Sequence, residues 1–268
     1  MKPLSIGRAW EETVVFIKRE GGLLFPVAFV FLALPPVIFQ QLIPASVTDC
    51  LRQMGDRKTA ILAFQAIPPG FWLGFALMVA ISVIGVLAIY ALAVRPGISV
   101  GEAMKLGLQR LPVLIGAGLL VTMGGGAVVI VLTVLAGLIS IVVGMAAVTA
   151  LLTVVVFAAL GFVGVRLFLL NAVVIDRPVT PLDAVRQSWA LTRGQFWRLA
   201  GFIIVLVFLV TIVQTATQSV FGVIGGLVGG PDIAVLVAGL ATAALSAVIQ
   251  VYVMVMTARI YRQLEGTA

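Results

Sequence analysis

The arginine and tryptophan side chains of this chain are its candidates for ligand binding, and the ligand that they would bind is an anion. One short segment contains Arg186, Trp189, Arg193, Trp197 and Arg198. A guanidinium group binds phosphate through paired N–H donors, and a tryptophan ring prefers the headgroup level of a bilayer. We therefore expect this segment to contact anionic lipid headgroups.

Arg166 is the one basic residue inside a long apolar run. If that run continues as a helix to Val174, Arg166 lies about 12 Å from the helix end at 1.5 Å per residue, deep enough to need a partner. No acidic residue lies in an apolar run, so the partner would be a lipid phosphate, or carbonyl and amide oxygens. The alternative is a shifted span in which Arg166 anchors the helix end. The predicted headgroup site on the cytoplasmic leaflet comprises Arg166, Arg186, Trp189, Arg193, Trp197, Arg198 and Arg259.

The residue types of most catalytic and metal sites are missing. The chain has no histidine and one cysteine, Cys50, so it can form neither an intrachain disulfide nor a site of several thiolates. All ten acidic residues lie outside the apolar runs, and the adjacent pair Glu11 and Glu12 is expected on a solvated helix face. No GxxxxGKS/T phosphate loop is present. We therefore expect no enzyme activity, no cofactor and no metal.

The composition is that of a membrane protein. Hydrophobic residues make up 62% of the 268 residues, and only 10% are charged, against about 25% in a soluble domain. The net charge of +7 comes from short segments that alternate with pairs of apolar runs. Attraction to the anionic inner leaflet explains such segments, so no nucleic-acid partner is expected.

The basic residues predict the orientation of the spans. Thirteen of the 17 Lys and Arg residues lie on one side of the predicted spans, and the loop 44–70 on the other side holds Arg52, Arg57 and Lys58. Short basic loops remain in the cytoplasm during insertion, so both termini are expected to be cytoplasmic. Continuous apolar runs also exclude the alternating strands of a β-barrel. The predicted fold class is an all-α integral membrane protein with six transmembrane helices in three pairs, at about residues 23–43, 71–94, 113–135, 144–174, 199–223 and 234–257.

Each pair of spans follows a segment with the signs of an amphipathic helix. Thr180 followed by Asp183 marks a helix start, and Ser99 followed by Glu102 is a second capping box. Ser5 is a weaker third copy, because no acid stands three residues after it. Basic amphipathic helices attached to spans lie in the membrane interface. We predict a single membrane domain, 1–268, built from three pseudo-repeats, 1–94, 95–176 and 177–268, each with one cytoplasmic interfacial helix and two spans.

Two stretches of the chain resemble a known family. They are VRLFLLNAVVIDRPVTPLDAVRQSWALTRGQFWRLAG, at 165–201, and ARIYRQL, at 258–264. They resemble the membrane domain of glycerophosphoryl diester phosphodiesterases, which also occurs alone. The resemblance implies a six-span protein of the bacterial inner membrane without an established activity. The catalytic barrel of those enzymes uses histidines, so phosphodiester hydrolysis is not expected to carry over to this chain.

The leading functional interpretation is a non-catalytic membrane protein that binds lipid, or a scaffold or accessory for an unspecified protein partner in envelope or lipid metabolism. The alternative is a transporter or flippase-like carrier of an amphiphilic small molecule. Gln214, Gln218 and Gln250 would form interhelical hydrogen bonds in the first case and a substrate path in the second. A polar groove lined by these glutamines and Arg166 would favour the carrier. A tightly packed bundle with a basic cytoplasmic surface would favour the scaffold.

Overall fold

The chain forms helices throughout the part that the computed structural model describes, residues 5–44, 46–47, 62, 64–65 and 67–266. No strand occurs among these residues. In chain order the elements are α1 (Ile6–Ala28), the π-helical segment η1 (Phe29–Ala33), α2 (Leu34–Gln41), α5 (Pro69–Val94), α6 (Val100–Val143), α7 (Met145–Leu167), α8 (Leu170–Asp176), α9 (Pro181–Leu191) and α10 (Phe196–Glu265).

Six segments of these helices are long and apolar enough to cross a membrane, which is the predicted number. They are Ile6–Gln40, Pro69–Val94, Val100–Ile139, Met145–Asp176, Phe196–Gly230 and Ile233–Glu265. The prediction of an all-α multi-pass membrane protein is therefore confirmed. The three predicted interfacial helices correspond to the first turns of α1, the first turns of α6, and α9.

Glycine turns reverse the chain within the last two pairs of spans. The direction of α10 changes at Gly229 and Gly230, where the backbone leaves helical geometry. Gly230 has a φ of +80°, in the left-handed region that favours glycine. Gly144, with a φ of +93°, lies between α6 and α7 in the same way. The turn between the spans predicted at 199–223 and 234–257 therefore lies at Gly229 and Gly230, whereas Gly225 and Gly226 remain helical.

All three predicted helix starts carry a side-chain cap. Thr180 Oγ1 accepts a hydrogen bond from the Asp183 amide at 3.3 Å and donates one to Asp183 Oδ2 at 2.6 Å. The Ser99 amide donates to Glu102 Oε2 at 2.8 Å, while Ser99 Oγ accepts from the Glu102 amide at 3.3 Å. Ser5 Oγ accepts from the amide three residues later, also at 3.3 Å. These local contacts support the predicted repeat, which stays a prediction.

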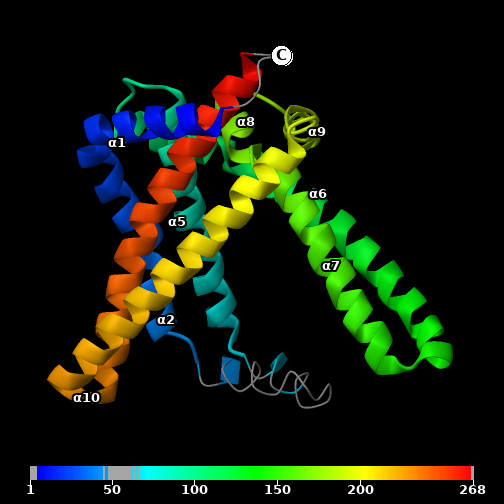
Figure 1. Ribbon diagram of the computed structural model, residues 1–268. Helices are drawn as coiled ribbons and strands as arrows, with labels where there is room; N and C mark the ends of the chain where they lie inside the picture. Colours follow the sequence, from blue (N-terminus) through cyan, green and yellow to red (C-terminus); the bar gives the residue numbers. More distant parts are fainter. Residues whose placement is uncertain (1–4, 45, 48–61, 63, 66, 267–268) are drawn as a thin grey trace.

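Both ends of the described chain lie on one side of the spans, which we call the terminal side. The Ser5 amide there donates a hydrogen bond to Gln263 Oε1 at 3.4 Å. The first part of α1 runs across the terminal side before the chain turns into the first span, and α9 lies on the same side (Figure 1). The turns at Gly144 and Gly230 lie on the opposite side, which we call the turn side (Figure 1).

The buried core is concentrated near the terminal side. It is formed mainly by the last turns of α5, most of α8 and the last turns of α10, which contact one another. Arg95 Nη2 donates to the Asp176 carbonyl at 3.0 Å, and the Arg262 guanidinium donates to the Val94 carbonyl. The Tyr261 hydroxyl donates to Asp176 Oδ2 at 3.0 Å. Side chains at the ends of α5, α8 and α10 therefore join these three span ends to one another.

A surface ion pair adds to this junction. Arg177, at the end of α8, pairs with Glu265 at the end of α10 and lies 3.7 Å from the Asp176 carboxylate. The hydrogen bond from Arg177 and the negative charge of Glu265 raise the pKa of the Arg177 guanidinium. Because the pair is exposed, solvent screening leaves it only a small contribution to stability.

The spans separate toward the turn side. The α6–α7 hairpin leans away from α5 and α10 (Figure 1), and its side chains there, such as Val134, Leu138 and Val154, are exposed. Lipid hydrocarbon is as apolar as these side chains, so no hydrophobic force draws the hairpin onto the other spans. The molecule is therefore closely packed at the terminal side and open at the turn side.

Two spans are not continuous α-helices. The first span is interrupted by η1, directly before Pro35 and Pro36, which lack the N–H of a regular helix. The fourth span breaks at Phe168 and Leu169, so α8 is a separate short helix. The predicted loop 44–70, with its three basic residues, lies largely outside the described residues.

Gly85 of α5 is a point where the first two spans approach closely. A methyl group at this position would meet the Phe31 and Leu32 side chains of η1. We expect Gly85→Ala to destabilise the protein by about 1–3 kcal/mol, because overpacking forces neighbours to move. Gly118→Ala is the matched control, since the space around Gly118 is open and alanine favours a helix. Thermal unfolding in detergent measures both variants, and equal stability would contradict the close contact.

Candidate functional site

The short helix α9 is fixed against the end of α7 by backbone and hydroxyl contacts. The Ser188 hydroxyl of α9 is buried and donates to the Arg166 carbonyl at 2.8 Å. The Thr192 hydroxyl, which follows α9, is also buried and accepts a hydrogen bond from Arg166 Nη1 at 3.5 Å. The α9 helix therefore has one defined position beside the fourth span.

The Arg166 guanidinium lies in an aromatic cage. Its Cζ atom lies 5.2 Å from the ring centroids of Phe162 and Trp189 and 5.4 Å from that of Phe196. Its Nη1 also donates to the Trp189 carbonyl at 3.5 Å. Ring faces stabilise a cation by about 0.5–2 kcal/mol each, more strongly where water is excluded. This cage holds the Arg166 charge without an acidic partner.

The Nε–H of Arg166 is enclosed and has no hydrogen-bond partner among the described residues. The oxygen atoms that the Arg166 guanidinium contacts are those of the Trp189 carbonyl and the Thr192 hydroxyl. Both are uncharged, like the carbonyl and amide oxygens that were predicted as one type of partner. The break at Phe168 also places Arg166 at the end of α7, which favours the reading of Arg166 as an anchor. The sequence could have suggested Phe162, one helical turn before Arg166, but it gave no sign that Phe196 would join them.

The other predicted residues of this segment face outward. Arg186, Arg193 and Arg198 are exposed, and none forms an ion pair with another described residue. Trp197 is 84% exposed and Trp189 is 38% exposed, so both rings are available to lipid. We call Arg186, Trp189, Arg193, Trp197 and Arg198 the α9 basic surface.

Arg259 lies at a different part of the terminal side. Its Cζ atom is 4.6 Å from the Phe16 ring centroid of α1, whereas every aromatic contact of Arg166 is to α7, α9 or the start of α10. The structure therefore brings Arg166 together with Trp189, but it places Arg259 against another interfacial helix. The α1 helix also carries its own acids, since Arg8 pairs with Glu12 at 3.0 Å.

Polar side chains line two grooves between the spans. The larger groove, with a volume of about 740 Å³, lies between η1, α2 and both spans of α10, and Gln40, Gln218 and Gln250 line it. The smaller groove, about 400 Å³, lies between α5, α8 and α10. Ser246 and Gln250 line both grooves. Arg166 lines neither of these two grooves.

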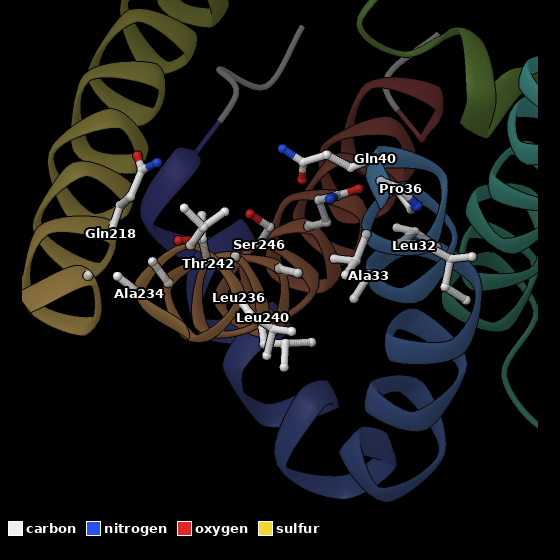
Figure 2. Close-up of a pocket in the computed structure, with 18 residues that line it drawn as sticks. Leu32, Ala33, Pro36, Gln40, Gln218, Ala234, Leu236, Leu240, Thr242 and Ser246 are labelled. Carbon is white, nitrogen blue, oxygen red and sulfur yellow. The ribbon is translucent and has the colours of Figure 1, made fainter. Parts of the chain in front are cut away.

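Gln214 forms the interhelical hydrogen bond that the sequence suggested. Its Nε2 atom donates to Ser246 Oγ at 3.0 Å, which joins the fifth and sixth spans. Figure 2 shows Gln218 on the fifth span, Thr242 and Ser246 on the sixth, and Gln40 on the opposite side from Gln218. Gln40 and Thr242 are groove residues that the sequence did not single out.

Among the described residues, no three His, Cys, Asp or Glu side chains are grouped so as to hold a metal ion. A family model described as a domain of unknown function, DUF7847, matches residues 4–264. The chain belongs to this family. No curated protein matches the chain, and no solved structure matches it. Membership of DUF7847 therefore adds no activity to what the geometry supports.

The aromatic cage predicts an effect of Arg166 on its neighbour Trp189. In a protein whose other tryptophans are replaced by phenylalanine, Arg166→Ala should shift the Trp189 emission to longer wavelength and make it easier to quench. The reason is that Trp189 loses its cation–π contact and the hydrogen-bond donor to its backbone carbonyl, together worth about 1–3 kcal/mol. Arg193→Ala, an exposed arginine of the same segment, is the control and should change neither signal. Unchanged Trp189 fluorescence in Arg166→Ala would contradict the cage.

Proposed function

We propose that the protein is a non-catalytic membrane protein of the bacterial inner membrane that binds anionic lipid headgroups at the α9 basic surface. The observation that carries this proposal is the combination of exposed arginines without acidic partners and exposed tryptophans on one short interfacial segment. Arginine binds phosphate oxygens in pairs, and tryptophan fixes the depth of the segment at the headgroups. Lipid held there would make the terminal side a platform for a protein partner.

The α9 basic surface is better suited to this role than the basic residues of α1. Arg8 pairs with Glu12, and Arg19 pairs with Glu20 at 3.1 Å, so neighbouring acids already offset those charges. On α9, the Asp183 carboxylate instead accepts a hydrogen bond from the N-cap residue Thr180. The uncompensated positive charge therefore lies around α9, and it attracts an anionic surface within about 10 Å at ordinary salt.

The inner-membrane location and the orientation belong to the same proposal. The distribution of basic residues supports a cytoplasmic terminal side, and the resemblance to the phosphodiesterase membrane domain supports the inner-membrane location. We also propose that the chain has no hydrolytic activity of its own, because it has none of the histidines that the catalytic barrel of those enzymes uses.

A carrier of an amphiphilic molecule is a second candidate function. The specific observation in its favour is that the two grooves share Ser246 and Gln250, so polar groups lie on both sides of the sixth span. Arg166, however, is held in its cage away from these grooves. Movement of a labelled lipid across vesicle membranes that contain the protein separates a carrier from a scaffold.

The lipid proposal predicts a loss of bound anionic lipid. Replacement of Arg186, Arg193 and Arg198 by alanine should weaken phosphatidylglycerol binding about 100-fold, since each basic residue near an anionic surface contributes about 1 kcal/mol. Native mass spectrometry of the protein in mild detergent measures the lipid that remains bound. The matched control replaces three basic residues of α1, Arg8, Lys18 and Arg19, and should lose less. Equal losses in the two variants would show general electrostatic attraction and contradict a site at α9.

The orientation proposal predicts which sides of the protein are accessible. In a Cys50→Ser background, Val228→Cys near the Gly230 turn should react with a membrane-impermeant maleimide added to the periplasmic side of intact inner membranes. Gln195→Cys, between α9 and α10, should react only after the membrane is permeabilised. Labelling in the reverse order would show that the terminal side is not cytoplasmic.

A further inference from the structure

The larger groove extends from the middle of the predicted membrane layer to its turn side. Its walls come from three spans: Gln250 lies near the middle of the span Ile233–Glu265, Gln218 lies in the turn-side half of Phe196–Gly230, and Gln40 is the last residue of Ile6–Gln40. The medium around the inner part of the groove is lipid hydrocarbon rather than water. The partners that water would give to polar side chains at a protein surface are therefore missing here.

Several polar groups of the groove lack a partner within the described part of the chain. The Thr242 hydroxyl oxygen is enclosed and accepts or donates no hydrogen bond there. The side-chain amides of Gln40 and Gln218 are exposed, yet neither amide forms a hydrogen bond with a described residue; the Gln40 carbonyl accepts from the Ile43 amide. An amide left unpaired in hydrocarbon is unfavourable, so these groups require hydrogen-bonding atoms from a molecule in the groove.

The chemistry of the groove specifies the polar part of that molecule. Its polar side chains are the amides of Gln40, Gln218 and Gln250 and the hydroxyls of Thr242 and Ser246, and no charged side chain lines it. Amides and hydroxyls both donate and accept hydrogen bonds. A phosphate or carboxylate at this depth would be an unpaired charge, which is far less favourable than an uncharged hydroxyl or ester.

The rest of the lining suits hydrocarbon chains. Leu32, Pro36, Leu236 and Leu240 present apolar surface along the groove, beside the polar groups (Figure 2). The segment η1–α2 also contains Pro35 next to Pro36. Neither proline has an N–H, so neither donates the usual helical hydrogen bond to the backbone carbonyl one turn earlier. The π-helical form of η1 is itself a feature found frequently at functional sites.

We propose that the larger groove binds an uncharged lipid whose head carries hydroxyl or ester groups, such as a diacylglycerol or a neutral glycolipid. The acyl chains lie along the apolar wall, and the head bonds with Gln218, Thr242 and Gln250. This site does not depend on the α9 basic surface, because its ligand has the opposite electrostatic requirement. One protein would thereby distinguish charged from uncharged lipids at two separate places.

The test measures binding of dioleoylglycerol and of a monoglucosyl diacylglycerol by native mass spectrometry. The full chain is purified in lauryldimethylamine oxide, whose head carries no hydroxyl. We expect one lipid per chain, displaced by dodecyl maltoside, which is itself an uncharged amphiphile rich in hydroxyls. Binding of dioleoylglycerol identifies the glycerol ester head as sufficient, and binding of the glucosyl lipid alone identifies the sugar as the ligand.

Substitutions locate the site. Gln218→Leu together with Gln250→Leu should reduce the bound lipid about tenfold, through the loss of two hydrogen bonds in the membrane. Thr242→Val, which keeps the shape of the side chain, should reduce it by a smaller factor. The matched control is Gln109→Leu, because Gln109 is an exposed glutamine of α6 outside the groove. An unchanged melting temperature shows that each variant is folded.

Two results would overturn the inference. One is equal binding of the uncharged lipids by the groove variants and by Gln109→Leu, and the other is preferential retention of phosphatidylglycerol that depends on Gln218. Removal of the three α9 arginines should leave binding of the uncharged lipid unchanged. Because that variant tests the α9 basic surface alone, failure of the groove site and failure of the proposed function are distinguishable.

Discussion

The polar junction of three span ends at the terminal side holds the spans of this protein together. Inside a bilayer the hydrophobic effect does not hold helices together, so close packing and polar contacts have to do so. Here the carbonyl at the end of α5 accepts from Arg262, and the carbonyl at the end of α8 accepts from Arg95. Each helix end leaves carbonyls without intrahelical donors, and these arginines satisfy them across the bundle. The spans are therefore fixed at one end and free to diverge at the other.

The interfacial helices extend this junction in a cyclic order. The end of α5 packs against the start of α6, where Gly107 allows the backbone to approach Leu87 and Ala88. The end of α7 contacts α9 through Arg166 and Trp189, and the end of α10 contacts α1 through Arg259 and Phe16. Each even-numbered span thus meets one interfacial helix. The fourth and sixth spans do so through an arginine beside an aromatic ring, and the second span does so through the close approach at Gly107.

The sequence was sufficient wherever the controlling interaction was local. The caps at Ser99 and Thr180 involve residues three apart, and the Gly230 turn follows from the φ that glycine allows. The cage of Arg166 could not be predicted, because Phe196 joins it only after α9 has folded back beside α7. The η1 segment was also missed, since prolines indicate a disturbed helix without specifying which hydrogen-bond pattern replaces it.

The open turn side links lipid to the arrangement of the spans. The grooves beside the sixth span contain amides and a hydroxyl, that of Thr242, without hydrogen-bond partners among the described residues. The Gln214 to Ser246 bond is a direct contact between the fifth and sixth spans at this level. A ligand that bonds Gln218 and Gln250 at once would join the same two spans. Lipid in the groove would then act as part of the packing, and its binding free energy would set how closely α10 folds upon itself.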